Sequence, residues 1–215
     1  VTVAGTRSID TDSDQTFVVT GDLTITGAFD ANGEPMELQG DLVNNGSFTH
    51  DNNTVTFGGD GVRQIRGGVA TEFYDLVITG TNTDANQVET GTDGAGKDVS
   101  VINDLTVDGY LEINDKAAGT TTVFVGGNVI IGAAGTFDAD DADQGIEIYT
   151  VGDWDNSGAF KSGVYSSNMF PGTAESTIYG ESSFRNLILN VPGKTVSFEA
   201  GATTTVTGLF QVQGT

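Results

Sequence analysis

Two acidic segments hold the residues whose types and spacing are best suited to chemistry. Asp10–Gln15 reads DTDSDQ, and Asp138–Gln144 reads DADDADQ. Calcium takes several carboxylate and carbonyl oxygens from a flexible loop, and alternating aspartates supply them. Neither segment has the glycine and glutamate positions of a helix–loop–helix calcium site, so an exposed acidic turn is the alternative interpretation. The second segment ranks first, and its predicted calcium ligands are Asp138, Asp140, Asp141 and Asp143.

Three basic side chains are candidates for a second chemistry, the cleavage of acidic polysaccharides. A lyase needs a base and cations that stabilise a developing carboxylate dianion. Arg63, Arg66 and Lys97 have the required residue types. The chain has only 8 Lys and Arg residues, and these three are not embedded in a repeated acidic groove. We therefore predict no catalytic residue and no enzyme, with a carbohydrate-active β-helix enzyme as the alternative.

The charge of the chain argues against two classes of partner. Its 215 residues include 30 acidic and 8 basic side chains, for a formal net charge of −22. This surface repels phosphate backbones and anionic lipid, so we expect no nucleic-acid partner. No apolar run approaches the roughly 20 residues of a membrane span, so we expect no membrane insertion. Acidic surfaces suit salty or extracellular surroundings, which predicts a secreted, extracellular protein.

The elements that would position these residues are short β-strands. Alternating runs of Val, Ile, Thr, Phe and Tyr recur along the chain, separated by Gly, Asn and Asp. This pattern is typical of many short strands joined by tight turns. No sustained apolar pattern with helical spacing occurs. The longest polar interruption, residues 81–98, predicts a protruding loop.

A long stretch of the chain occurs twice. The first copy spans residues 40–78 and begins GDLVNNGSF, and the second spans 152–189 and begins GDWDNSGAF. The offset between the copies is the same at Gly40 and Gly152 as at Phe48 and Phe160. A smaller unit, Gly-Asp/Asn-apolar followed by Gly-x-Phe/Leu, recurs with a period in the low twenties. Such a period is typical of one coil of a parallel β-solenoid.

This period predicts an all-β fold, a parallel β-solenoid (β-helix) of roughly nine to ten coils that forms a single elongated domain over residues 1–215. Inward-facing residues would stack in apolar columns, with Trp154 in the core. The repeated Gly is expected in a positive-φ corner, next to an Asp or Asn turn residue. The predicted turn residues are Asp22, Asp41, Asp104, Asn128 and Asp153. The alternative interpretation of these residues is a catalytic or calcium-binding row.

A second architecture also fits the long repeat. Two tandem β-sandwich domains, each of the usual size of about 100 residues, would account for the spacing between the copies. The small unit, however, recurs inside each supposed domain, and no Pro-rich linker lies near Gly96–Asp98. Both observations favour the solenoid.

Three strings carry a family resemblance. They read GDLVNNGSF, TVTFGGDGVRQIRGG and FYDLVITG. Together they resemble repeats of large bacterial and archaeal cell-surface, adhesin-like proteins of the right-handed parallel β-helix kind. The resemblance covers both copies of the long stretch and is weaker elsewhere. It implies a β-helix fold and a location at the cell surface, and it carries no catalytic residue.

The two ends of the chain predict its function. Val1–Val3 and Leu209–Thr215 read as strands in mid-pattern, without a polar or helical cap. Uncapped solenoids expose strand edges, which recruit another chain. We therefore predict a structural protein that joins copies of itself end to end in a filament, or that adjoins neighbouring repeats of a longer chain. A calcium-dependent adhesion module is a further alternative, and surface glycans are a further predicted partner.

Overall fold

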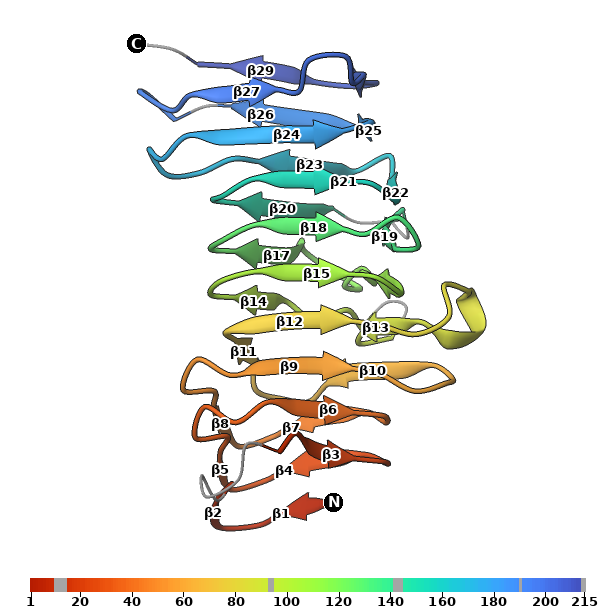
Figure 1. The fold of residues 1–215 in the computed structure, drawn as a ribbon, viewed down its shortest axis with the longest axis vertical. Coiled ribbons are helices and arrows are strands. Elements are labelled where there is room, and N and C mark those ends of the chain that lie inside the picture. The colour runs from red at the N-terminus through yellow and green to blue at the C-terminus, as the bar shows by residue number, and fades with distance from the viewer. Residues whose placement is uncertain (10–14, 93–94, 141–144, 190, 214–215) are drawn as a thin grey trace.

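The computed structural model describes residues 1–9, 15–92, 95–140, 145–189 and 191–213. They form one stack of coils with the two termini at opposite ends (Figure 1). Each coil has three strands, and within a sheet each strand pairs with the strand three places further along the chain. The fold is an all-β parallel β-solenoid of about nine turns, as predicted. The pairs between described strands are parallel, so the sandwich alternative, which needs antiparallel sheets, is wrong.

The first face of the solenoid, face one, contains an eight-stranded sheet and, near the C-terminal end, a two-stranded one. The eight strands are β1 (Thr2–Val3), β4 (Leu23–Ile25), β7 (Leu42–Asn44), β10 (Arg63–Arg66), β13 (Val88–Thr90), β16 (Tyr110–Glu112), β19 (Thr136–Ala139) and β22 (Ala159–Ser162). The other two are β25 (Ser182–Phe184), which lies against β22, and β28 (Thr204–Val206).

The second face, face two, contains a three-stranded sheet followed by a seven-stranded one. The first three strands are β2 (Thr6–Ser8), β5 (Ala28–Asp30) and β8 (Ser47–Thr49). The next seven are β11 (Glu72–Phe73), β14 (Val99–Val101), β17 (Thr121–Val125), β20 (Ile146–Thr150), β23 (Ser166–Met169), β26 (Asn186–Leu189) and β29 (Phe210–Val212).

The third face, face three, is a continuous nine-stranded sheet. Its strands are β3 (Phe17–Val19), β6 (Met36–Leu38), β9 (Thr54–Phe57), β12 (Asp75–Ile78), β15 (Leu105–Val107), β18 (Val129–Ile131), β21 (Trp154–Asn156), β24 (Ser176–Gly180) and β27 (Val196–Phe198).

The core consists of apolar columns that run along the axis of the stack. Alternate residues of each strand point inward, so equivalent positions of consecutive coils lie directly above one another. One fully buried column on face three contains Leu76, Leu105, Val129, Trp154 and Ile178. The expected core position of Trp154 is therefore confirmed. Its ring centroid lies 4.8 Å from that of Phe160 and 5.4 Å from that of Phe184.

The long repeat preserves its local structure. The buried amide of Asn44 donates a hydrogen bond to the Thr71 hydroxyl at 3.1 Å in the first copy. At the equivalent place in the second copy, the buried amide of Asn156 donates to the Ser182 hydroxyl, also at 3.1 Å. Both bonds join one coil to the next, so the repeated Asn is a structural residue of the corner.

The second copy of the repeat lies on different faces from the first. The first copy begins with β7 on face one, and the second begins with β21 on face three. These strands are 14 places apart, two more than four complete coils of three strands. The second copy is therefore shifted by two faces around the axis. The same sequence unit can occupy different faces because all three are built from inward-alternating strands.

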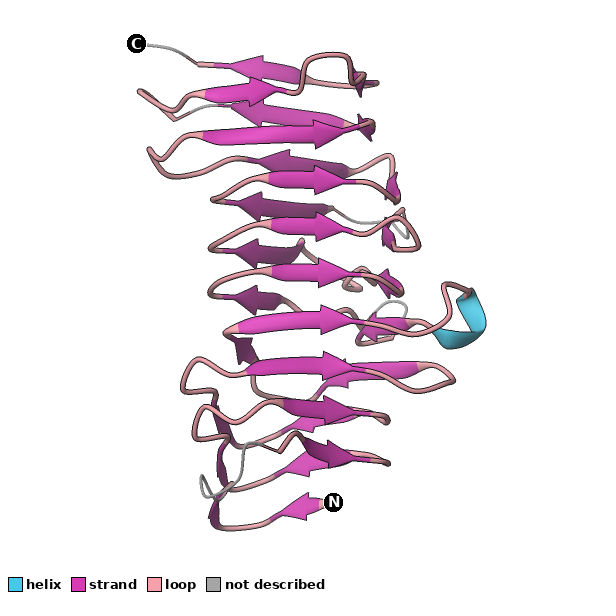
Figure 2. Cartoon of the chain, viewed as in Figure 1, coloured by secondary structure: helices cyan, strands magenta, loops and turns pink. Residues whose placement is uncertain are grey.

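Coil length varies with the loops between strands. The coil from Leu23 to its partner Leu42 is short, whereas the coil from Leu76 to its partner Leu105 is about half as long again. This longer coil contains the range 81–98, for which a protruding loop was predicted. Its first part includes the 3₁₀ turn η1 (Asp84–Asn86), which stands out from the stack in Figure 2.

A later part of the range 81–98 contributes to the core. It contains β13, whose Val88 and Thr90 are fully buried on face one. The sequence pattern did not indicate this strand, because Val-Glu-Thr is short and has a single apolar residue. The neighbouring strands supply the pairing that its own sequence does not specify.

The repeated glycine has a different role from the one predicted. Gly40 and Gly152 do not have positive φ, so the expectation of a positive-φ corner is wrong. A Cβ on Gly40 would lie 2.4 Å from the backbone carbonyl carbon of Gly21. A Cβ on Gly152 would lie 2.6 Å from the carbonyl oxygen of Gly127. Glycine is required because consecutive coils approach backbone to backbone at this corner.

This close approach predicts that Gly40→Ala destabilises the solenoid by about 2 kcal/mol, because the methyl group forces the two coils apart. Gly21→Ala is the matched control, since a Cβ on Gly21 would meet nothing within 4 Å and its φ is also not positive. Urea unfolding followed by circular dichroism measures both changes. Equal losses of unfolding free energy in the two variants would show that the close approach of the coils is not the reason for glycine at position 40.

Candidate functional site

The structure describes two of the four predicted calcium ligands. Asp138 lies in β19 and Asp140 follows that strand, while Asp141 and Asp143 lie outside the described residues. The Oδ1 atom of Asp138 accepts the backbone N–H of Asp140 at 3.0 Å. Within the described part of the chain, no group of three or more His, Cys, Asp and Glu residues is placed to hold a metal ion. Calcium binding therefore stays a prediction.

Asp138 belongs to a cluster with Tyr110 and Lys161 on face one. The Tyr110 hydroxyl donates to Oδ2 of Asp138 at 2.5 Å, and the Lys161 ammonium donates to the same oxygen at 2.7 Å. The ammonium also lies 4.8 Å from the centroid of the Tyr110 ring. These residues come from β16, β19 and β22, which are neighbours in the sheet, so the cluster links three consecutive coils.

The protonation states of this cluster suit a structural role. Burial, together with the hydrogen bond to Asp138, raises the pKa of Tyr110 to about 12. Burial acts to lower the pKa of Lys161, but hydrogen bonds to Asp138 and Tyr110 outweigh it and raise that pKa. A general base at neutral pH needs a pKa near 7. Tyr110 and Lys161 both keep their protons there, so neither is suited to take a proton from a substrate.

The Asp and Asn residues of the small unit form a ladder between coils. On face three, Oδ1 of Asp104 accepts the backbone N–H of Asn128 at 2.7 Å, and Oδ1 of Asn128 accepts that of Asp153 at 2.8 Å. The equivalent bond joins Asp22 to Asp41 on face one at 3.0 Å. The side-chain oxygens are directed at the backbone of the next coil. This geometry favours the turn interpretation over a row of ligands.

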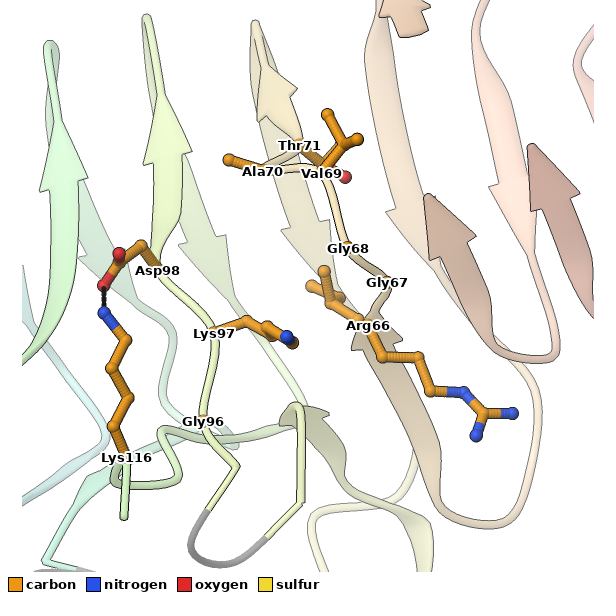
Figure 3. A pocket seen from close by; sticks show the side chains of 11 residues that line it. Arg66, Gly67, Gly68, Val69, Ala70, Thr71, Gly96, Lys97, Asp98 and Lys116 are labelled. Atoms are coloured by element: carbon orange, nitrogen blue, oxygen red, sulfur yellow. Dashed lines mark hydrogen bonds and ion pairs between the residues drawn. The ribbon is translucent and has the colours of Figure 1, made fainter. Parts of the chain in front are cut away.

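A pocket of about 330 Å³ collects an unusual share of the basic residues. The turn Arg66–Thr71, the segment Gly96–Asp98 and Lys116 line it (Figure 3). Three of the chain's 8 Lys and Arg residues lie here, namely Arg66, Lys97 and Lys116. The sequence had indicated the first two by residue type alone. It did not indicate Lys116, whose proximity follows from the coil and not from sequence spacing.

Two of the three cations in this pocket are paired. The guanidinium of Arg66 lies 2.7 Å from a carboxylate oxygen of Asp41, and the ammonium of Lys116 lies 2.6 Å from one of Asp98. No described residue forms an ion pair with Lys97. Figure 3 shows its side chain extending toward the turn that begins at Arg66, whose own guanidinium points away. Among the described residues, Lys97 is therefore the cation of this pocket that has no ion-pair partner.

Arg63, the third basic residue indicated by the sequence, does not line this pocket. Its side chain is buried, and its guanidinium donates to the carbonyl oxygens of Gly58, Gly59 and Asn86. Burial lowers the pKa of Arg63. The guanidinium holds the turn after β9 against Asn86, the last residue of η1, which is a structural role.

Apolar pockets lie at both ends of the stack. The N-terminal pocket measures about 470 Å³, and its apolar lining residues are Val1, Val3, Ile9, Phe17 and Phe29. The C-terminal pocket measures about 530 Å³, and its lining residues are Leu187, Phe198, Ala202, Thr204, Val206 and Phe210.

The C-terminal pocket exposes residues that would be core in an inner coil. Phe198 stacks in register on Ile178, and Phe210 stacks on Leu187. Ile178 and Leu187 are fully buried, whereas Phe198 is 46% exposed and Phe210 is 53% exposed. The two phenylalanines continue the apolar columns, and no coil of the described residues covers them.

No family model matches the chain, and neither a curated protein nor a solved structure matches it. The resemblance to adhesin-like repeats therefore stays a prediction, and the fold is established by the structure alone. Among the described residues, no helix has the length and apolar character to cross a membrane.

The Tyr110 cluster predicts a loss of stability in alkaline solution. The pKa of Tyr110 is about 12 in the folded chain and about 10 in an unfolded one. Its contribution to stability is therefore complete below pH 10 and is lost as the pH rises toward 12. We expect Tyr110→Phe to reduce this alkaline loss by up to about 2 kcal/mol.

Thermal melts of the wild type and the variant between pH 9 and pH 12 measure the effect. The control is Tyr165→Phe, at a tyrosine that is 58% exposed, which should leave the pH profile unchanged. An unchanged profile for Tyr110→Phe would contradict the role assigned to the cluster.

Proposed function

We propose that this chain is a non-enzymatic structural β-solenoid that joins further copies of itself end to end. The observation that supports the proposal is the open apolar pocket at each end of the stack, where no described coil covers the inward-facing side chains. Exposed apolar patches of this kind mark interaction sites. A second copy of the chain is the occupant with matching geometry, as the strand edges indicate.

The strand edges at the two ends are complementary. The last strands on faces one, two and three are β28, β29 and β27, and the first strands on those faces are β1, β2 and β3. Each end therefore presents one open edge on every face. Because all coils run in the same direction, the C-terminal end of one copy can pair in parallel with the N-terminal end of the next. This is strand addition at a sheet edge, applied to three sheets at once.

End-to-end contact of this kind is open. The two surfaces in contact are different, and nothing in a straight stack closes the assembly into a ring. Head-to-tail contacts that do not close produce filaments. A filament-forming solenoid is the expected product.

The charge of the chain sets the conditions for assembly. Copies with a formal net charge of −22 repel one another, and the repulsion is screened over a Debye length of about 8 Å at physiological ionic strength. Assembly should therefore strengthen as salt is added. The acidic surface and the resemblance to cell-surface repeats support an extracellular location for such a filament.

Val212 offers a direct test of the end contact. It lies in β29, the last strand, stacks on Leu189 and is 60% exposed. Val212→Asp places a charge in the proposed apolar interface, which should weaken association at least about tenfold because a buried unpaired charge is costly. Val164→Asp is the matched control, since Val164 is 61% exposed but lies in the turn after β22.

Sedimentation velocity over a range of protein and salt concentrations measures association. We expect large species for the wild type and Val164→Asp, and monomers for Val212→Asp. A wild-type chain that stays monomeric at all protein and salt concentrations would refute the proposal.

A further inference from the structure

We propose that the pocket at Arg66–Thr71, Gly96–Asp98 and Lys116 binds a small carboxylate, with Lys97 as the residue that contacts it. The pocket and its lining are those of Figure 3. This binding site lies on the side of the rod and is independent of end-to-end assembly.

The local charge selects the class of ligand. The lining contains three cations and one carboxylate, that of Asp98. Arg66 pairs with Asp41, which lies outside the lining, and Lys116 pairs with Asp98, so one cation, Lys97, has no ion-pair partner among the described residues. A ligand with a single negative charge balances it. A phosphate dianion would place an excess negative charge beside the Asp98 carboxylate on a chain whose net charge is already −22. A carboxylate is therefore favoured over a phosphate.

The two existing ion pairs leave room for a ligand. The side chains of Arg66 and Asp98 are 45% and 50% exposed, so solvent weakens both pairs. A ligand carboxylate can share the ammonium of Lys116 with Asp98, because an ammonium group has three donors. Lys97 needs no exchange of partner, since no described residue is paired with it.

The walls of the pocket are fixed by backbone hydrogen bonds. The Lys97 N–H donates to the carbonyl oxygen of Thr90 at 2.9 Å, and the Gly96 N–H donates to that of Asp115 at 2.7 Å. On the other wall, Gly67 has a φ of 127° and lies so close to the preceding coil that a Cβ would lie 2.0 Å from the carbonyl oxygen of Asn44. A site whose backbone is already held in place loses little entropy on binding.

The size of the pocket sets the size of the ligand. A volume of about 330 Å³ lies at the lower end of the range for small-molecule sites. The lining contains no aromatic side chain, so an aromatic acid has no stacking partner. A free organic acid and a uronic-acid sugar remain as the two sources of the same carboxylate. With one cation that has no ion-pair partner among the described residues, we expect a Kd on the order of 1 mM.

Ligand-observed saturation-transfer NMR on the full chain tests the inference, and it works for monomers and filaments alike. The probes are acetate, galacturonate and galactose. We expect signals for acetate and galacturonate and none for galactose. A stronger signal for galacturonate than for acetate assigns the site to an acidic sugar, and equal signals assign it to a free carboxylate.

Variants locate the binding. Lys97→Gln should weaken acetate and galacturonate binding about tenfold, because it removes the positive charge that contacts the ligand. Arg185→Gln removes one positive charge from a side chain that donates to the carbonyl oxygens of Val164 and Thr207, away from this pocket, and should leave binding unchanged. Binding of galactose equal to that of galacturonate, absence of binding by both acids, or full binding by Lys97→Gln would each overturn the inference. End-to-end assembly, measured by sedimentation, is expected to be the same in Lys97→Gln and the wild type.

Discussion

The close approach of each coil to the one before it is the constraint on which the rest of the structure depends. Strands on three faces must hydrogen-bond with the previous coil at once, at a spacing of about 4.8 Å. At the corner of Gly40 and Gly152 this spacing leaves no room for a Cβ. Beside that corner, the Asp and Asn side chains accept backbone N–H groups of the next coil. Glycine and aspartate thus serve one purpose, which is to bring two backbones together and satisfy their polar groups.

The sequence supported the fold because it carries two signals that a coil of three short strands requires. Apolar residues alternate within each short run, and the small unit recurs with a period in the low twenties. Trp154 was predicted in the core because it replaces Leu42 of the first copy. The role of Gly40 was predicted wrongly because a positive-φ turn and a close approach of two backbones both favour glycine. The shift of the second copy by two faces could not be foreseen, because strand pairing depends on coil lengths, which vary with the loops between strands.

The candidate site was harder to predict than the fold. Arg66 and Lys97 were indicated by residue type, but a sequence does not reveal that the coil brings Lys116 to the same pocket. Arg63 has the same residue type as Arg66, yet it is buried and bonded to carbonyl oxygens. The two arginines differ in direction because residues of β10 alternate between inward and outward positions. Arg63 is directed inward, and Arg66 is exposed. Residue type alone did not distinguish the structural arginine from the one at the pocket.

The two ends of the stack follow from the same constraint as the interior, which is that each coil pairs with its neighbours. Every inner coil is covered on both sides, and the terminal coils leave one strand edge on each face and an apolar pocket uncovered. Hydrogen–deuterium exchange measured at dilute and at assembling concentrations tests this account most directly. Peptides from β1–β3 and β27–β29 should gain protection on assembly, while those from β15 and β18 should remain equally protected throughout. Protection gained along the central coils, or none gained at the ends, would contradict it.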